Sequence, residues 1–411
     1  TGITVTSDNG STIQGNYIGI TPNGTPMKNK TSGITIAGTA TNVLIGGTTA
    51  GQGNYISGNN TAVSDAGINI NSTTGVNGVT IQGNYIGVKP DGVTAAPNGY
   101  GIQIAGASNG PVNITIGGNT AGARNIISGN ITAGINGTAL TTSTSNYLIA
   151  GNYIGLDKNG NTLTGAAGRG IQLTNPNGIQ IGGDSTAGYS NVISGNPSDA
   201  IAFSGTAGTG QNFKIWGNLI GTKPDGVTAA NNGGYGVNSY ATVMNGSVQI
   251  GGSGTGQGNV IVNSNNTWGV MVLNASAAAN PVQIRGNFIG ILKDGTAAGH
   301  LSGGLFVSAS NGVQVGGTSA GDGNIISGNN TLGTSPGLRI DGSTNITVQG
   351  NTIGLGPNGV TKVANGFGML FGGAASTNVT IGGSTAGARN IISGNTTYGI
   401  STVGATFSST S

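Results

Sequence analysis

One short pattern recurs twelve times along the chain and restricts its possible folds more than any other feature. In every copy an asparagine is followed two residues later by an isoleucine, and the asparagines of alternate copies lie 64 to 71 residues apart. Two related units, A and B, therefore alternate along the chain. A fixed period of this kind is typical of proteins in which each repeat packs only against its neighbours. The asparagines are Asn16, Asn54, Asn84, Asn125, Asn152, Asn191, Asn218, Asn259, Asn287, Asn324, Asn351 and Asn390, and the isoleucines are Ile18, Ile56, Ile86, Ile127, Ile154, Ile193, Ile220, Ile261, Ile289, Ile326, Ile353 and Ile392.

Two further apolar patches flank this pattern in each unit. The first ends in Ile or Val shortly before the asparagine, as at Ile13, and the third begins with Gly-Ile, as at Gly33-Ile34. In a strand every second side chain points inward, so stacked units would place isoleucine over isoleucine and asparagine over asparagine. A buried asparagine is stable only when it is hydrogen-bonded, and a stacked amide can bond the amides above and below it. We expect this asparagine column to be a structural ladder and the isoleucines to form the core.

The predicted fold is all-β: a single-stranded right-handed parallel β-helix, or solenoid, with about twelve coils and three short strands per coil. Residues 1–411 would form one continuous domain made of six A/B double repeats of about 64–71 residues. The 84 glycines suit tight turns between short strands. A hydrophobic content of 35% with a net charge of only +3 is not typical of a disordered chain.

Composition also excludes several classes of function. The absence of cysteine excludes disulfides and thiolate metal sites. The thirteen basic residues are scattered along the chain, so we expect no nucleic-acid partner. No run of 18 apolar residues is present, so we expect no transmembrane segment. The chain begins at Thr1 without an apolar leader, which suits a mature secreted protein or an excised fragment equally well.

Candidate catalytic residues are few. All ten acidic residues are aspartates, and no two of them lie within ten residues of each other. Glycoside hydrolysis needs two carboxylates at a defined separation, and only Asp225 and Asp294 occupy the same loop in successive A units. We expect His300 to be a solvated loop residue, and Arg124 and Arg389 to be surface residues. The sequence therefore predicts no catalytic, cofactor-binding or metal-binding residues and no enzyme.

An apolar column is expected on the outer surface. The residue between each asparagine and its isoleucine should point outward, and it is apolar or aromatic in nearly every copy. Either the long loops cover this column, or it is a lateral contact surface. The column is Tyr17, Tyr55, Tyr85, Ile126, Tyr153, Val192, Leu219, Val260, Phe288, Ile325, Thr352 and Ile391.

The repeats resemble the pectate-lyase-like right-handed parallel β-helix superfamily, whose interior contains asparagine and aliphatic ladders. Phrases such as IGGNTAGARNIISGN from Ile116 and GNYIG from Gly15 also resemble repeats of large exported bacterial surface proteins. The resemblance covers nearly the whole chain. It implies the fold rather than a function, because this fold is found in lyases, hydrolases, phage tailspikes, adhesins and stalks.

We interpret the chain as an extracellular or cell-surface structural repeat protein. Gly2-Ile3 and Gly399-Ile400 begin the same strand phrase, and neither end has a cap. Copies of the chain are therefore the expected partners, stacked end to end into a filament or an adhesive stalk. The alternative is a polysaccharide-active lyase or hydrolase on a β-helix, which converging carboxylates and a basic residue would favour. An ice-binding protein is less favoured, because it would need a regular plane of threonines. Any carbohydrate or surface ligand stays open.

Overall fold

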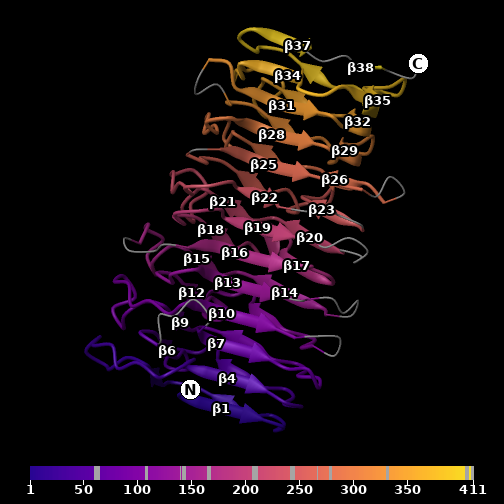
Figure 1. Ribbon diagram of the computed structural model, residues 1–411. Coiled ribbons are helices and arrows are strands. Elements are labelled where there is room, and N and C mark those ends of the chain that lie inside the picture. Colours follow the sequence, from indigo (N-terminus) through magenta and orange to yellow (C-terminus); the bar gives the residue numbers. More distant parts are fainter. Residues whose placement is uncertain are drawn as a thin grey trace. The chain divides into compact units, whose positions relative to one another are not determined.

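The computed structural model describes residues 1–59, 65–106, 110–138, 140, 145–163, 168–205, 212–240, 246–265, 267–276, 280–329, 333–402 and 407–408. The chain folds as an all-β parallel β-solenoid of about 11 turns with three parallel sheets, which confirms the predicted fold class. Each turn adds one strand to each sheet, so the strands that pair are three apart in the numbering (Figure 1). The chain divides into two compact units, unit 1 (Thr1–Ile201) and unit 2 (Ala202–Ser411). The single continuous domain stays a prediction.

Unit 1 contains six strands of each sheet. Sheet 1 consists of β1 (Ile3–Thr6), β4 (Ile34–Ala37), β7 (Ala66–Asn71), β10 (Tyr100–Ala105), β13 (Ala133–Thr138) and β16 (Arg169–Thr174). Sheet 2 consists of β2 (Thr12–Ile13), β5 (Leu44–Gly46), β8 (Thr80–Gln82), β11 (Thr115–Gly117), β14 (Tyr147–Ala150) and β17 (Ile179–Gly182). Sheet 3 consists of β3 (Tyr17–Ile18), β6 (Tyr55–Ile56), β9 (Tyr85–Ile86), β12 (Ile126–Ile127), β15 (Tyr153–Ile154) and β18 (Val192–Ile193).

Unit 2 repeats the same arrangement. Sheet 1 consists of β19 (Ile201–Ser204), β22 (Val237–Ser239), β25 (Trp268–Leu273), β28 (Gly303–Ser308), β31 (Pro336–Asp341), β34 (Phe367–Gly372) and β37 (Tyr398–Thr402). Sheet 2 consists of β20 (Phe213–Trp216), β23 (Val248–Ile250), β26 (Val282–Ile284), β29 (Asn311–Gly316), β32 (Thr344–Gln349), β35 (Ser376–Ile381) and β38 (Phe407–Ser408). Sheet 3 consists of β21 (Leu219–Ile220), β24 (Val260–Ile261), β27 (Phe288–Ile289), β30 (Ile325–Ile326), β33 (Thr352–Ile353) and β36 (Ile391–Ile392).

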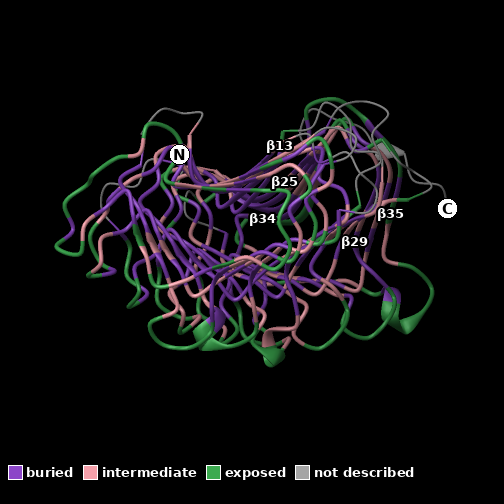
Figure 2. Ribbon diagram, turned by 90° about the horizontal axis from the view of Figure 1, so that it is seen from below, coloured by how far each residue is buried: buried purple, intermediate pink, exposed green. Residues whose placement is uncertain are grey.

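The interior of each unit is a stack of aliphatic side chains. In sheet 3 the register places isoleucine beside isoleucine, as in Ile56 with Ile86 and Ile289 with Ile326. These four side chains have no exposed surface. Figure 2 shows the same division along the chain, with strand segments mostly buried and the loops exposed. Of the twelve isoleucines in the recurring pattern, Ile392 alone is part-buried and the other eleven are buried.

Helical structure in the described residues is confined to three short 3₁₀ turns. They are η1 (Ala121–Ala123), η2 (Ser185–Ala187) and η3 (Ala386–Ala388), and each precedes a sheet 3 strand of a B unit. Among the described residues, no helix has the length and apolar character needed to cross a membrane.

Candidate functional site

The recurring asparagines lie in the turn between sheet 2 and sheet 3, where they form hydrogen-bonded columns inside each unit. In unit 2, the side-chain oxygen of Asn324 accepts hydrogen bonds from the backbone N and the Nδ2 of Asn287, at 3.0 and 2.9 Å. The Nδ2 of Asn324 donates to the carbonyl of Ile284 at 2.7 Å and to the Oδ1 of Asn351 at 2.9 Å. Each amide thus bonds the next turn as well as a sheet 2 carbonyl, so these buried polar groups are satisfied.

A second polar column, which the sequence interpretation missed, lies just after sheet 3. In unit 1 the Nδ2 of Asn59 donates to the Oδ1 of Asn98 at 3.0 Å, and that of Asn98 donates to the Oδ1 of Asn130 at 3.1 Å. In unit 2 the Nδ2 of Asn329 donates to the Oδ1 of Asn365 at 3.0 Å. The sequence signal was the recurrent Ser-Gly-Asn after the sheet 3 isoleucine in B units.

His300 belongs to this second column, so its expected place as a solvated loop residue is wrong. The side chain is fully buried. Its Nδ1 accepts a hydrogen bond from the backbone N of Ser264 at 3.1 Å, and its Nε2 lies 3.0 Å from the carbonyl of Ile261. These partners require a neutral ring with the proton on Nε2. Burial lowers the pKa of His300 to about 4, against a smaller opposing effect of the Ile261 carbonyl.

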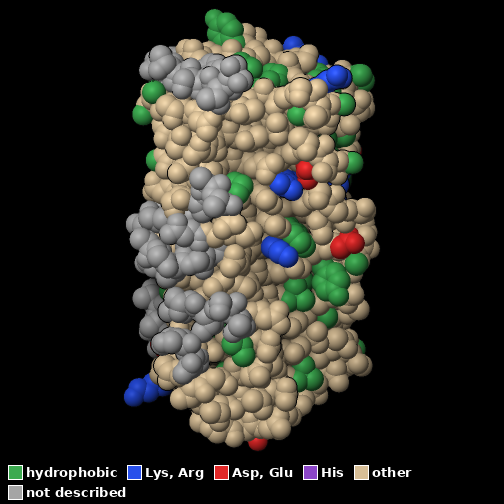
Figure 3. All heavy atoms as spheres, turned by 90° about the vertical axis from the view of Figure 1, so that its right-hand side faces the viewer, with side chains coloured by type: hydrophobic (Ala, Val, Ile, Leu, Met, Phe, Trp, Pro, Cys, Tyr) green, Lys and Arg blue, Asp and Glu red, His purple; other side chains and the backbone are tan. Residues whose placement is uncertain are grey.

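The loop aspartates serve mainly as turn residues. In the loop after β21, Asp225 accepts hydrogen bonds from the backbone N of Val227 and Thr228, both at 2.9 Å, and from the Thr228 hydroxyl at 2.5 Å. The Thr228 hydroxyl and these two amides hold the pKa of Asp225 below its usual value. Within the described residues no group of three or more His or Asp side chains could hold a metal ion. Figure 3 shows few charged side chains on one face, among them a basic side chain in contact with an acidic one.

The outward column of sheet 3 is partly covered. Val260 is 1% exposed and packs in a cluster with Val262 and Leu292, which lies in the following A-unit loop. Tyr17 and Ile391 are 44% and 46% exposed. The loops therefore cover part of the column, and other members remain in contact with solvent.

The outer face of sheet 1 in unit 2 contains a row of large side chains. Phe306 of β28 stands in register with Arg339 of β31, and the Phe306 and Trp268 rings stack with centroids 4.9 Å apart. The guanidinium carbon of Arg339 lies 5.3 Å from the centre of the Phe306 ring, within cation–π range. Gly303 makes room for this stack, because a Cβ there would lie 2.4 Å from Trp268 Cζ3. Phe306 and Arg339 thus stand in one outward column, which continues in β25 at Met271, and the buried Trp268 ring stacks on Phe306 from the start of that strand.

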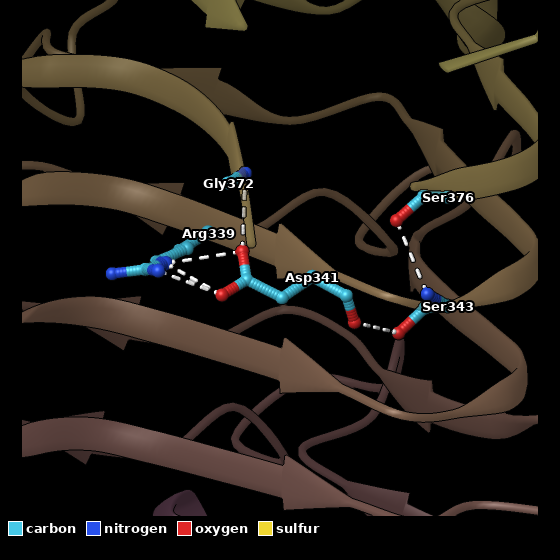
Figure 4. Close-up of polar contacts among 5 residues, drawn as sticks. All are labelled: Arg339, Asp341, Ser343, Gly372 and Ser376. Atoms are coloured by element: carbon cyan, nitrogen blue, oxygen red, sulfur yellow. Dashed lines mark hydrogen bonds and ion pairs between the residues drawn. The ribbon is translucent and has the colours of Figure 1, made fainter. Parts of the chain in front are cut away.

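Asp341 orients the guanidinium of Arg339 (Figure 4). Both side chains project from the same face of β31, two residues apart. Arg339 donates from Nη2 to Asp341 Oδ2 at 2.7 Å and from Nε to both carboxylate oxygens at 3.0 and 3.1 Å. The backbone N of Gly372 in β34 donates to Asp341 Oδ1 at 3.1 Å. Bidentate pairing of this kind fixes the guanidinium plane.

The column retains an open donor. Nη1 of Arg339 has no hydrogen-bond partner among the described residues, and the side chain is 34% exposed. Asp341 is only 13% exposed, so it serves to hold the arginine in place. An oriented cation beside apolar ring surface suits a ligand that has both oxygen acceptors and apolar C–H groups, as a sugar does. The sequence interpretation missed this group, because its members lie 33 or more residues apart and only the solenoid brings them together.

No protein-family model and no curated protein sequence matches the chain. Its fold is similar to that of solved pectate-lyase-like right-handed β-helix proteins, which confirms the predicted resemblance. A periplasmic alginate epimerase is 10% identical, with 98% of this chain and 70% of that chain covered and a TM-score of 0.37. The mannuronan epimerase A-module of Azotobacter vinelandii is 12% identical (98% and 91% covered, TM-score 0.29). An alginate lyase solved with a trisaccharide is 11% identical (97% and 80% covered, TM-score 0.27).

Two expectations from the sequence are corrected by this comparison. The structural fibre or adhesive stalk is contradicted, because the solved structures of this fold that the chain resembles include polysaccharide epimerases, a lyase and a tailspike rather than filament proteins. The expectation that the chain is not an enzyme is contradicted by the epimerases and the lyase among them. Sequence reasoning sought only clustered carboxylates and did not find the arginine and aromatic rings that the register of sheet 1 brings together.

Proposed function

We propose that the chain is a carbohydrate-active β-helix protein that binds and processes a polysaccharide across the outer face of sheet 1 in unit 2. The supporting observation is the outward column of Phe306 and Arg339 with the Trp268 ring stacked on Phe306, with Asp341 orienting the guanidinium and Nη1 left free. A polysaccharide occurs outside the cytoplasm in most settings, so we place the activity in an extracellular or cell-surface compartment.

The hydrogen-bond donors of Arg339 favour an acidic polysaccharide as the ligand. Arginine pairs with carboxylates through parallel N–H donors, and half-buried Phe306 offers apolar surface beside it. A cation held against a uronate carboxylate would also stabilise the negative charge that develops when a base, here supplied by the solvent, takes up the adjacent ring proton. Elimination or epimerisation of a uronate is therefore the class of reaction that Arg339 suits, and Asp341 acts as a positioning residue.

The test is an activity and binding assay on a panel of polyuronates and uncharged glucans. Elimination is followed by the ultraviolet absorbance of the unsaturated product, and epimerisation by NMR of the uronate ring. We expect turnover of a polyuronate, and Arg339→Gln should lower it about tenfold or more, the effect of losing one charge-assisted hydrogen bond. Arg285→Gln is the matched control, since Arg285 also pairs with an aspartate (Asp322, 3.5 Å) in unit 2.

Two results would refute the proposal. One is that the intact chain neither binds nor converts any polysaccharide of the panel. The other is that Arg339→Gln and Arg285→Gln lower turnover equally, because the effect would then belong to general stability rather than to the column on sheet 1.

A further inference from the structure

A groove in unit 1 presents a second group of aromatic and cationic side chains. It encloses about 550 Å³ and lies between the outward tyrosines of sheet 3 and the glycine-rich turns that precede that sheet. Gly47, Gly51 and Gly122 are among its walls, so peptide groups line one side of it. At Gly51 an added Cβ would meet nothing within 4 Å, which shows that the turn borders open space.

Tyr17, Tyr55 and Tyr85 form a regular row along this groove. Their ring centroids are 5.0 Å and 4.9 Å apart, with interplanar angles of 11° and 24°. The spacing follows from the parallel register of β3, β6 and β9, since neighbouring strands lie about 4.8 Å apart. Burial, with the neighbouring phenols of Tyr85 and Tyr17, raises the pKa of Tyr55, so its hydroxyl stays protonated and can donate. The row therefore offers a phenol hydroxyl at each turn.

Two cations stand at the same groove. The guanidinium of Arg124 lies over the Tyr153 ring, 4.2 Å from its centre, and its Nε donates to the carbonyl of Gly151 at 3.4 Å. Lys158 is exposed, and its aliphatic stem passes close to Gly92, where an added Cβ would be 2.6 Å from Lys158 Cδ. Neither cation forms an ion pair with a described residue, and no carboxylate is among the described residues that line the groove.

We propose that this groove binds an anionic polysaccharide, with Arg124 and Lys158 contacting its carboxylate or sulfate groups and the tyrosine hydroxyls donating to its oxygens. Unpaired positive charge in the groove complements such a chain, and charge-assisted hydrogen bonds are the stronger ones. The tyrosine row repeats along the solenoid at a fixed step, which suits a linear polymer with a repeated unit. This binding site lies in unit 1, does not depend on Arg339, and would hold polysaccharide rather than convert it.

The sequence supplies a matched control. Arg389 stands in the same TAGARN segment as Arg124 and is exposed, but the residue that pairs with Ile391 in the preceding strand is Thr352, where the groove in unit 1 has tyrosines. Arg124→Gln and Arg389→Gln therefore remove the same charge from the same local sequence. Only the first variant changes the groove.

The experiment is calorimetric titration of the full chain with four probes. They are polygalacturonate oligosaccharide, dextran sulfate, uncharged dextran and a single-stranded oligonucleotide. We expect one or both charged glycans to bind and dextran not to bind, with binding that weakens as salt rises. In the Arg339→Gln background, which removes the site proposed on sheet 1 of unit 2, Arg124→Gln and Lys158→Gln should each raise the Kd about tenfold, and Tyr55→Phe should raise it less, while Arg389→Gln leaves it unchanged. Circular dichroism melting confirms that each variant is folded.

Each titration result has a distinct meaning for the proposal. Preference for polygalacturonate or for dextran sulfate assigns the anionic group, and either preference supports the proposal. Equal binding of dextran, tighter binding of the oligonucleotide, or equal weakening by Arg389→Gln and Arg124→Gln would overturn it. Loss of binding in Arg339→Gln alone would place the polysaccharide on sheet 1 of unit 2 and would also overturn it, leaving the proposed function intact.

Discussion

At the scale of single residues, the solenoid depends on amides that are buried yet fully paired. Asn54 and Asn84 have no exposed surface, and each bonds the asparagine of the next turn as well as a carbonyl of sheet 2. Such a group stabilises the fold only while its partners are present, because a stranded buried donor or acceptor costs about 1–3 kcal/mol. Asparagine is suited to this place because it donates and accepts at once.

A first prediction compares two adjacent residues. Asn324→Leu keeps the side-chain size but removes a hydrogen-bond partner from the backbone N and Nδ2 of Asn287 and from the carbonyl of Ile284, so we expect the melting temperature to fall by several degrees. Ile325→Thr, on the outward face of the strand that follows, is the control and should lower the melting temperature less. Equal melting temperatures in a thermal scan would show that the amide column contributes little to stability.

A second prediction concerns pH and His300. Burial lowers the pKa of this ring to about 4, so the unfolded chain, with a value near 6.5, binds more protons between these two values. The stability from neutral His300 is therefore complete above about pH 6.5 and declines as the pH falls towards 4, by about 3 kcal/mol over that range.

The measurement is the urea midpoint at pH 7 and pH 4.5 for the intact chain and for His300→Asn. Asparagine occupies the corresponding place at Asn98 and Asn329, so the variant should fold and lose less stability on acidification. The difference between the two proteins isolates the contribution of the histidine. An identical pH dependence would mean that His300 is not buried as a neutral ring.

At the scale of elements, the strands are very short, and neighbouring turns stabilise them. Sheet 3 strands contain only two residues each, as in β27 and β30. Two residues give little pairing energy by themselves, so the isoleucine column and the amide turns that flank it must hold the sheet together. The stability of each turn therefore depends on the turns stacked directly above and below it.

A third prediction follows for the core column of unit 2. Ile289→Ala opens a cavity beside Ile261 and Ile326, which pair with it on either side, and should cost about 2–5 kcal/mol. Hydrogen exchange should show faster opening in β24, β27 and β30 and little change several turns away within unit 2. Phe288→Ala, on the outward face of β27, is the control. Uniform loosening throughout unit 2 would contradict nearest-neighbour coupling.

At the scale of the whole molecule, charge contributes little to stability. Charged residues are 6% of the chain, with a net charge of +3. In the pair Arg285–Asp322, nitrogen and oxygen are 3.5 Å apart; Asp322 is buried, but the arginine side chain is 24% exposed, so solvent screens its charge. Stability instead comes from buried aliphatic columns and amide ladders, which neutral salts affect only weakly.

A fourth prediction concerns salt, and tests whether buried columns or ion pairs stabilise the fold. Raising the ionic strength to about 0.5 M should change the stability by less than about 1 kcal/mol, because screening removes only weak surface interactions. The same change should weaken the binding of a charged glycan in the groove of unit 1. Thermal scans and titrations in parallel check both parts. A large loss of thermal stability in salt would mean that ion pairs, rather than the ladders, hold the turns together.

The amino-acid sequence by itself determined the fold class, because the spacing of Asn and Ile in Asn84-Tyr85-Ile86 and its eleven counterparts is compatible with stacking and with little else. The many glycines also predicted tight turns between the short strands. These features depend on residues near one another in the chain, so a period read along the sequence is sufficient to find them.

Only the tertiary structure decided the environment of residues whose partners lie on other turns. His300 looked solvated because its partners Ile261 and Ser264 are 36 or more residues away, and the stack alone brings them together. Arg339 lies beside Phe306 for the same reason. Arg124 lines the groove of unit 1, whereas Arg389, in an identical TAGARN segment, does not line it. The physical reason is that the register between turns sets which side chains are buried and which charges lie close together. A repeat read along the sequence specifies only the path of each turn.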